Sequence, residues 1–104
     1  MVLEADHLAL VKQLLAHYVP DIDVWAFGSR VQGNPKPHSD LDLALVSERP
    51  LPINVLAQLS HAFEESDLPI RVDLVELHKV DPAFRAVIER QHEVIQRRSS
   101  SQNP

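Results

Sequence analysis

Two neighbouring stretches of the chain decide the fold: VWAFGSRVQG at residues 24–33 and SDLDLALV at residues 39–46. The apolar run of the first stretch stops at Gly28, and a run of this length is typical of a buried strand. In the second stretch, leucine alternates with aspartate, alanine and valine over residues 41–46, which predicts a strand over these residues with its leucines on one face. The chain thus contains a strand that ends in Gly-Ser and, soon after it, a strand that begins with two acidic residues.

Hydrophobic spacing predicts three helices and one further strand around these two. A first helix ends before Pro20, a second opens at Pro50, and residues 70–77 (IRVDLVEL) have the composition of a strand. A last helix begins at Pro82 and runs to about Arg98. This order of elements predicts an α/β (α+β) fold, with a small mixed sheet of about three or four strands and flanking helices.

Length and composition restrict the class of protein. The chain has 104 residues, no cysteine and a net charge of −5, and 44% of its residues are hydrophobic. We expect a single domain over residues 1–98 and a disordered tail over residues 99–104. The absence of cysteine excludes a disulfide scaffold and thiol catalysis, and the negative charge argues against a direct nucleic-acid partner. No apolar run approaches the ~20 residues of a membrane span, so we expect a cytoplasmic protein.

The Gly-Ser pair at the end of the first strand predicts an anion site. Where a strand passes into a helix, backbone N–H groups are left unpaired, and a glycine lets a phosphate approach them closely. Ser29 can add a hydroxyl donor and Arg30 a positive charge. Taken alone, a Gly-Ser pair after a strand is more commonly a simple turn.

Three aspartates make the site hypothesis stronger. Asp40 and Asp42 are two residues apart, so in a strand they point the same way and repel each other at ~7 Å or less. A hard divalent cation such as Mg²⁺ would resolve this conflict. Asp73 interrupts another apolar strand and would lie beside the first two acids if the strands pair. The alternative is a loop cap at Asp40 and solvent-facing edge positions at Asp42 and Asp73.

The pattern of these residues resembles the signature of the nucleotidyltransferase superfamily. A Gly28-Ser29 pair, the acids of Ser39-Asp40-x-Asp42 and a lone Asp73 in a later strand occur in that order. With so short a chain, the sequence is similar to the minimal nucleotidyltransferase (MNT) family, the antitoxin partners of HEPN toxins. The resemblance covers roughly residues 24–77.

The resemblance implies a role for each matching residue. In the family, the Gly-Ser pair holds the nucleotide phosphates, which would be the role of Gly28 and Ser29. The first two acids bind Mg²⁺, and these would be Asp40 and Asp42. The third acid, here Asp73, completes the metal site and helps to activate the acceptor hydroxyl.

Two more residues of the loop match the family. Arg30 and Gly33 correspond to residues common in minimal members, and the resemblance implies that they belong to the nucleotide-binding loop. The family is also reported to transfer AMP from ATP to a tyrosine of the HEPN toxin. We therefore expect an ATP-dependent, Mg²⁺-dependent protein adenylyltransferase that forms a homo- or hetero-oligomer with the toxin. Two alternatives stay open: a non-catalytic binding antitoxin, and a transferase that acts on a small molecule or an RNA end.

The remaining candidates have simpler explanations. The six histidines show no metal-ligand spacing, and His38 is expected to be a loop residue that lies near the phosphates at most. Trp25 and Phe27 are expected in the core instead of in a base-stacking platform. Arg97 and Arg98 are expected to end the last helix, where their charge suits its dipole.

Overall fold

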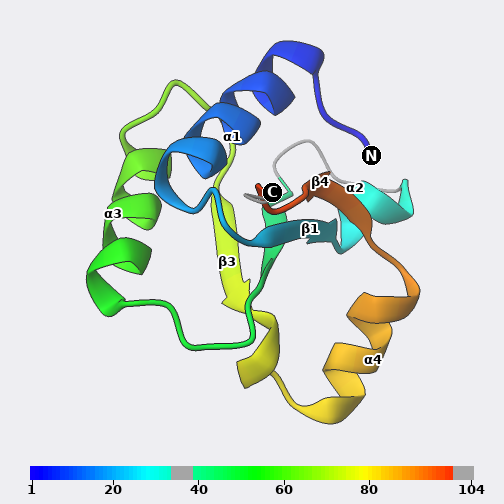
Figure 1. The fold of residues 1–104 in the computed structure, drawn as a ribbon. Helices are drawn as coiled ribbons and strands as arrows, with labels where there is room; N and C mark the ends of the chain where they lie inside the picture. The colour runs from blue at the N-terminus through cyan, green and yellow to red at the C-terminus, as the bar shows by residue number, and fades with distance from the viewer. Residues whose placement is uncertain (34–38, 100–104) are drawn as a thin grey trace.

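A four-stranded mixed sheet forms the centre of the computed structural model, which describes residues 1–33 and 39–99 (Figure 1). The strands are ordered β3-β2-β1-β4 across the sheet. β2 pairs with β3 in parallel, whereas β1 pairs antiparallel with both β2 and β4. This arrangement confirms the predicted mixed sheet. The strands are β1 (Asp23–Phe27), β2 (Leu41–Val46), β3 (Val72–Glu76) and β4 (Glu93–Gln96).

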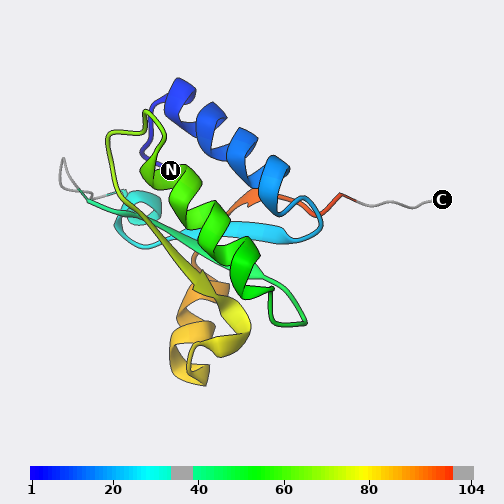
Figure 2. The same cartoon turned by 90° about the vertical axis from the view of Figure 1, so that its left-hand side faces the viewer.

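Helices cover the two faces of the sheet unequally. Seen from the side, α1 (Ala5–Tyr18) and α3 (Ile53–Glu64) lie on one face, and α4 (Pro82–Arg90) lies on the other (Figure 2). A single turn, α2 (Ser29–Gln32), follows β1 directly, and a 3₁₀ turn, η1 (Leu77–Lys79), follows β3. The chain therefore passes from β1 into a helical turn directly after Gly28.

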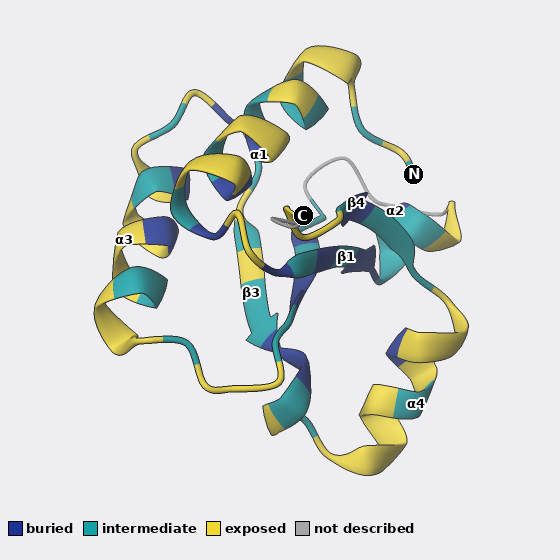
Figure 3. Ribbon diagram, viewed as in Figure 1, coloured by how far each residue is buried: buried dark blue, intermediate teal, exposed yellow. Residues whose placement is uncertain are grey.

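Alternation along β2 divides the core into two layers. Leu41, Leu43 and Leu45 belong to the larger cluster under α1 and α3. Ala44 belongs to the smaller cluster under α4, together with Ile88. Figure 3 shows that the buried positions concentrate along β1 and β2, the two central strands. The predicted division of this strand into two faces is confirmed, and it directs Asp42 toward the face of α4.

The prediction that the last helix runs to about Arg98 is wrong beyond Arg90. α4 ends at Arg90, and residues that would have continued it form β4 on the open edge of β1. The side-chain amide of Gln96 donates hydrogen bonds of 2.8 and 3.0 Å to the carbonyls of Val19 and Ile22, which fixes this strand to the chain before β1. Pairing satisfies the unpaired backbone groups of β1, which a helix could not do.

The two arginines after β4 are consequently not at a helix end. The backbone N–H of Arg98 donates to a carboxylate oxygen of Asp23 at 2.6 Å, and the N–H of Ser99 donates to the carbonyl of Pro20 at 2.9 Å. The chain thus remains attached to the sheet through residue 99. The rest of the predicted disordered tail, residues 100–104, lies outside the described residues.

The aromatic side chains of β1 lie on the face that α4 covers. Phe27 is buried in the smaller cluster, as predicted, and its ring meets Phe84 of α4 edge to face at 5.8 Å. Trp25 is half-buried and stacks on His92 with ring centroids 3.9 Å apart. None of the helices in the described part of the chain is long and apolar enough to cross a membrane.

Candidate functional site

A row of residues across three strands forms the centre of the candidate site. Antiparallel pairing places Phe27 of β1 opposite Asp42 of β2, and parallel pairing places Asp42 opposite Asp73 of β3. Gly28 directly continues β1 past Phe27. The predicted meeting of Asp42 and Asp73 is therefore confirmed by the register, although 31 residues of sequence separate them.

The contact between Gly28 and Asp42 is unusually close. Gly28 has φ of +84°, and a Cβ atom at this position would collide with Oδ2 of Asp42 and lie 3.2 Å from its Cγ. Only glycine satisfies both conditions, because it has no Cβ and adopts positive φ at little cost. The glycine thus lets the carboxylate lie directly against the start of the loop.

The loop after β1 presents backbone donors. The N–H groups of Val31 and Gln32 donate to the carbonyl of Gly28 at 3.1 and 3.0 Å, which closes the turn of α2. Ser29 and Arg30 are the first two residues of this turn, and their N–H groups have no backbone acceptor among the described residues. Because unpaired N–H groups at the start of a helical turn attract anions, these two are available to a phosphate.

Gly33 ends this turn. Its N–H donates to the carbonyl of Ser29 at 3.1 Å, and its φ of +88° lies in the left-handed region. No atom lies within 4 Å of the place where its Cβ would be. Gly33 therefore serves the turn geometry, in contrast to Gly28, which serves close packing. The predicted loop residue His38 lies outside the described residues.

The carboxylate of Asp42 is repelled by its two acidic neighbours. Burial raises the pKa of Asp42, and the negative charges of Asp73 and Asp40 raise it further. In residues 1–33 and 39–99, no three His, Cys, Asp or Glu side chains are arranged to hold a metal ion by themselves. Carboxylate oxygens under mutual repulsion nevertheless fit Mg²⁺, which binds through one or two carboxylates and takes its other ligands from water and substrate phosphates.

Arg30 lies near these groups but points elsewhere. Its side chain belongs to the few polar ones that are buried, with 7% exposure. Its guanidinium donates to the carbonyl of Ser39 at 2.9 and 3.1 Å and to the carbonyl of Val2 at 2.9 Å. Three of its donors are therefore already engaged with the backbone.

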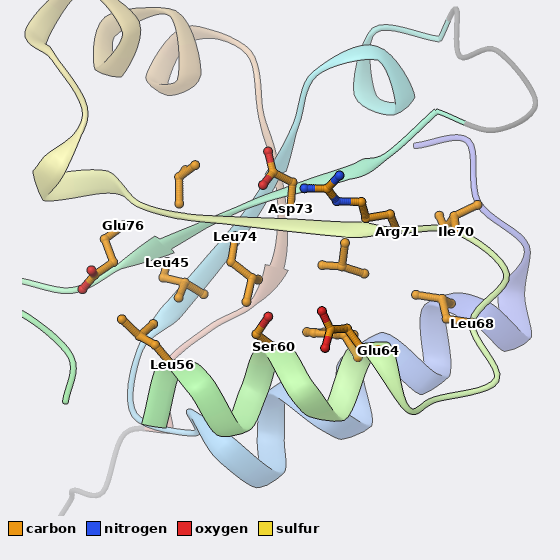
Figure 4. A pocket seen from close by; sticks show the side chains of 13 residues that line it. Leu45, Leu56, Ser60, Glu64, Leu68, Ile70, Arg71, Asp73, Leu74 and Glu76 are labelled. Atoms are coloured by element: carbon orange, nitrogen blue, oxygen red, sulfur yellow. The ribbon is translucent and has the colours of Figure 1, made fainter. Parts of the chain in front are cut away.

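Asp73 is the most accessible of the three acids, because β3 is an edge strand. In Figure 4 its side chain lies on the side of β3 that faces away from α3, and Arg71 extends on the same side. Leu74 extends in the opposite direction, toward α3. The groove of about 630 Å³ drawn there, between β3 and α3, thus borders Asp73 but does not contain the row of site residues.

A smaller cavity, of about 320 Å³, contains that row. Gly28, Asp42 and Asp73 line its polar end, and an apolar wall from α4 closes the other. Its volume lies in the range of small-molecule sites. Gln32, Phe84, Val87 and Gln91 also line this cavity, and none of them is predicted as a site residue. The helical spacing of Phe84, Val87 and Gln91 is the signal that could have placed these three on one side of the last helix.

The exposure of this apolar wall is unusual. Phe84 is 40% exposed and Val87 is 46% exposed, although both belong to the helix that covers the sheet. Their neighbour Ile88 is fully buried. The cavity therefore combines two repelling carboxylates with an accessible apolar wall, whereas Ser29, Arg30 and Asp40 do not line it. Gly28 joins its polar end to the loop whose N–H groups are available to a phosphate, so the arrangement suits a phosphorylated ligand with an aromatic part.

Such a site on a mixed sheet is that of a nucleotide-binding transferase, and comparison with known proteins agrees. Residues 10–101 match the family described as polymerase beta, nucleotidyltransferase. The chain belongs to this family. It is 46% identical over 99 residues to the probable protein adenylyltransferase MntA of Haemophilus influenzae (strain ATCC 51907 / DSM 11121 / KW20 / Rd). The aligned residues cover 95% of this chain and 87% of that protein.

Solved structures share the fold. One is a crystal structure of a toxin–antitoxin with AMP-PNP, with a TM-score of 0.71 and 23% identity over 90% of this chain and 74% of that one. Another is a tri-AMPylated Shewanella oneidensis HEPN toxin in complex with its MNT antitoxin, with a TM-score of 0.65 and 19% identity over 88% of this chain and 70% of that one. The resemblance to minimal nucleotidyltransferases and the predicted fold class are thereby confirmed.

Proposed function

We propose that this protein is an ATP-dependent protein adenylyltransferase that modifies a cognate HEPN-family toxin and so serves as its antitoxin. The observation that carries the proposal is the row formed by Gly28, Asp42 and Asp73 at one cavity. Identity of 46% with a probable protein adenylyltransferase supports the transfer to a protein acceptor. We further propose that the two proteins assemble with each other and that the reaction takes place in the cytoplasm.

In this proposal the loop after β1 binds the phosphates of ATP and the three aspartates bind the cation. The N–H groups of Ser29 and Arg30, with the hydroxyl of Ser29, are the donors for its phosphates, and Gly28 leaves room for them. Mg²⁺ held by Asp40, Asp42 and Asp73 would neutralise charge on the phosphates and lower the barrier to attack by a hydroxyl. Without a cation, the phosphates would meet the same repulsion that raises the pKa of Asp42.

The acceptor that we propose is a tyrosine hydroxyl of the toxin. Its pKa near 10 keeps it protonated at neutral pH, so a base is needed near the oxygen. The hydroxyl oxygen attacks the α-phosphorus, the bond between the α- and β-phosphates breaks, and pyrophosphate leaves. The proton passes to Asp73, because this acid is both exposed at the sheet edge and paired in register with Asp42. The AMP product adds bulk and negative charge to a ribonuclease that must bind RNA phosphates.

The test is to incubate both proteins with Mg²⁺ and ATP, separate them, and then weigh and assay the toxin. We expect a mass gain of ~329 Da per modified site, the AMP moiety of this transfer, and a loss of ribonuclease activity that outlasts removal of the antitoxin. The Asp42→Asn variant should form the complex but transfer nothing. A toxin of unchanged mass that is silenced only while bound would favour a non-catalytic antitoxin, and AMP found only on a small molecule or an RNA end would favour the other alternative.

A further inference from the structure

Arg30 connects three segments that are far apart in the sequence. The Nε and Nη2 atoms of its guanidinium both donate to the carbonyl of Ser39, at 3.1 and 2.9 Å. Its Nη1 atom donates to the carbonyl of Val2 at 2.9 Å, and its own carbonyl accepts from the N–H of Val2 at 2.9 Å. Arg30 is 7% exposed and the three side-chain bonds are partly buried, so water can replace them only in part and their loss would cost free energy.

The carbonyl that Arg30 holds belongs to the residue directly before Asp40. On the other side of Asp40, the N–H of Leu41 donates to the carbonyl of Arg71 at 2.9 Å. The backbone of Asp40 is thus held between two fixed points, one at the guanidinium and one at the start of β3. Because Arg30 follows Ser29 within α2, the first of these bonds also joins the phosphate-binding loop to the segment that carries the first acid.

We propose that Arg30 is a positioning residue that fixes Asp40 relative to Ser29, and that it does not bind the nucleotide through its side chain. Three of the five N–H donors of the guanidinium already bind the carbonyls of Ser39 and Val2, and turning its fork toward a phosphate would break these bonds. The planar fork of arginine can donate to the carbonyl of Ser39 and the carbonyl of Val2 at the same time, whereas lysine presents a single point charge. This inference rests on the proposed nucleotidyltransferase function, since it assigns Asp40 to cation binding.

The first test measures the affinity of the isolated protein for Mn²⁺ without nucleotide, by paramagnetic resonance of the free ion. Arg30→Lys keeps the charge but loses the fork, and we expect its Mn²⁺ affinity to fall about 10–100-fold, the range found when partners that orient metal ligands are removed. Arg90→Lys, at an exposed position of α4, is the matched control and should leave the affinity unchanged. In an Asp40→Asn background, Arg30→Lys should add little, because its effect acts through Asp40.

One result of these affinity measurements would overturn the proposal. If Arg30→Lys leaves the Mn²⁺ affinity intact and weakens only the binding of ATP, the side chain is a phosphate ligand and the proposal is overturned. Neither the Mn²⁺ affinity nor the ATP affinity depends on transfer to the toxin. A protein without adenylyltransferase activity could therefore still confirm the positioning role, and an active adenylyltransferase could still contradict it.

A second measurement on the unaltered protein covers the case in which Arg30→Lys does not fold. In nitrogen-15 spectra, the Nε–H signal of Arg30 should be protected from solvent exchange before any nucleotide is added. It should stay protected, without coupling to phosphorus, after ATP and Mg²⁺ are added. An Nε–H signal that exchanges freely, or that couples to a phosphate, would overturn the proposal.

Discussion

At Gly28 a single methyl group should disrupt the site. In Gly28→Ala the new Cβ collides with Oδ2 of Asp42, and the backbone must hold φ of +84° with ψ of −159°, a conformation essentially restricted to glycine that costs roughly 1–3 kcal/mol. We expect a loss of stability larger than this strain alone, together with loss of ATP binding. Urea unfolding and nucleotide titration measure the two effects.

Gly33→Ala is the matched control for this change. Its φ of +88° and ψ of 6° lie in the left-handed region, which alanine disfavours by roughly 1–2 kcal/mol, and its Cβ would meet nothing within 4 Å. We expect Gly33→Ala to cost less than Gly28→Ala, which adds the collision and a more restricted backbone conformation. In an Asp42→Ala background the collision is absent, so Gly28→Ala should cost less there than in the native protein. Equal costs of the two glycine variants in the native background would contradict the close contact.

Asp42 should make the protein less stable when it is ionised. Burial, Asp73 and Asp40 all raise its folded-state pKa above the ordinary value of about 3.9. A raised pKa contributes stability that is complete below the unfolded-state pKa and is lost as the pH rises through the folded-state pKa. Asp42→Asn does not ionise, so we expect it to be at least as stable as the native protein at pH 7.

The measurement is urea unfolding of the two proteins, without added cation, from pH 4 to pH 8. The advantage of Asp42→Asn should shrink as the pH falls. An Asp42→Asn variant that is less stable at pH 7 would mean that the carboxylate has a structural role instead.

At the scale of the elements, β2 could be predicted because its hydrophobic residues follow a clear local pattern, whereas β4 could not be predicted. β2 has the predicted bounds, 41–46, because alternation of leucine with smaller or polar residues has a single interpretation at that length. β4 was not predicted, because Val94 and Ile95 also fit the spacing of the preceding helix. What decides its conformation is the open edge of β1, a tertiary feature that no local pattern contains.

Glu76, at the end of β3, should stabilise the contacts of this strand with Lys79 of η1 and with Leu51, which precedes α3. Burial raises its pKa, but hydrogen bonds from Lys79 at 2.8 Å and from the N–H of Leu51 at 3.1 Å, with the charges of Lys79 and His78, lower the pKa overall. A lowered pKa contributes stability that is present above the unfolded-state value of about 4.3 and is lost as the pH falls through the folded-state pKa.

Glu76→Gln should therefore lower the free energy of unfolding at pH 7 by about 1–3 kcal/mol, the range for hydrogen bonds to a charged group. The difference from the native protein should diminish in acid. Glu89→Gln is the control, because its pair with Arg85 is exposed and should contribute no more than about 1 kcal/mol. Denaturation in urea at pH 7 and near pH 4 measures both, and a pH-independent cost for Glu76→Gln would refute the linkage.

At the scale of the whole molecule, the meeting of Asp42 and Asp73 could be predicted from the sequence, but the apolar wall of the cavity could not. Parallel pairing of the strands was enough to bring Asp73 beside Asp42. The position of α4 depends on packing across the opposite face, so Phe84 and Val87 could not be assigned to the cavity from their spacing. The engaged guanidinium of Arg30 likewise depends on Val2 and Ser39, which no motif connects to it.

ATP with a divalent cation should stabilise the whole fold. The cation pairs with carboxylates that otherwise repel, and a ligand at a hundredfold excess over its Kd contributes about 2.7 kcal/mol. We expect a higher melting temperature with Mg²⁺ and ATP together than with either alone. The Asp42→Asn variant is the control and should lose most of this increase. A rise of equal size in that variant would place the binding elsewhere.

The stack of Trp25 on His92 gives the protein an intrinsic optical reporter. Trp25 is the only tryptophan of the chain, and it lies two residues before Phe27, which lines the cavity. Its partner ring lies just after α4 and just before β4, with 3.9 Å between the centroids. Indole emission therefore responds to any separation of this junction from β1. One fluorescence signal, without a label, can follow both the unfolding of the sheet and a shift of the cavity wall when a ligand enters.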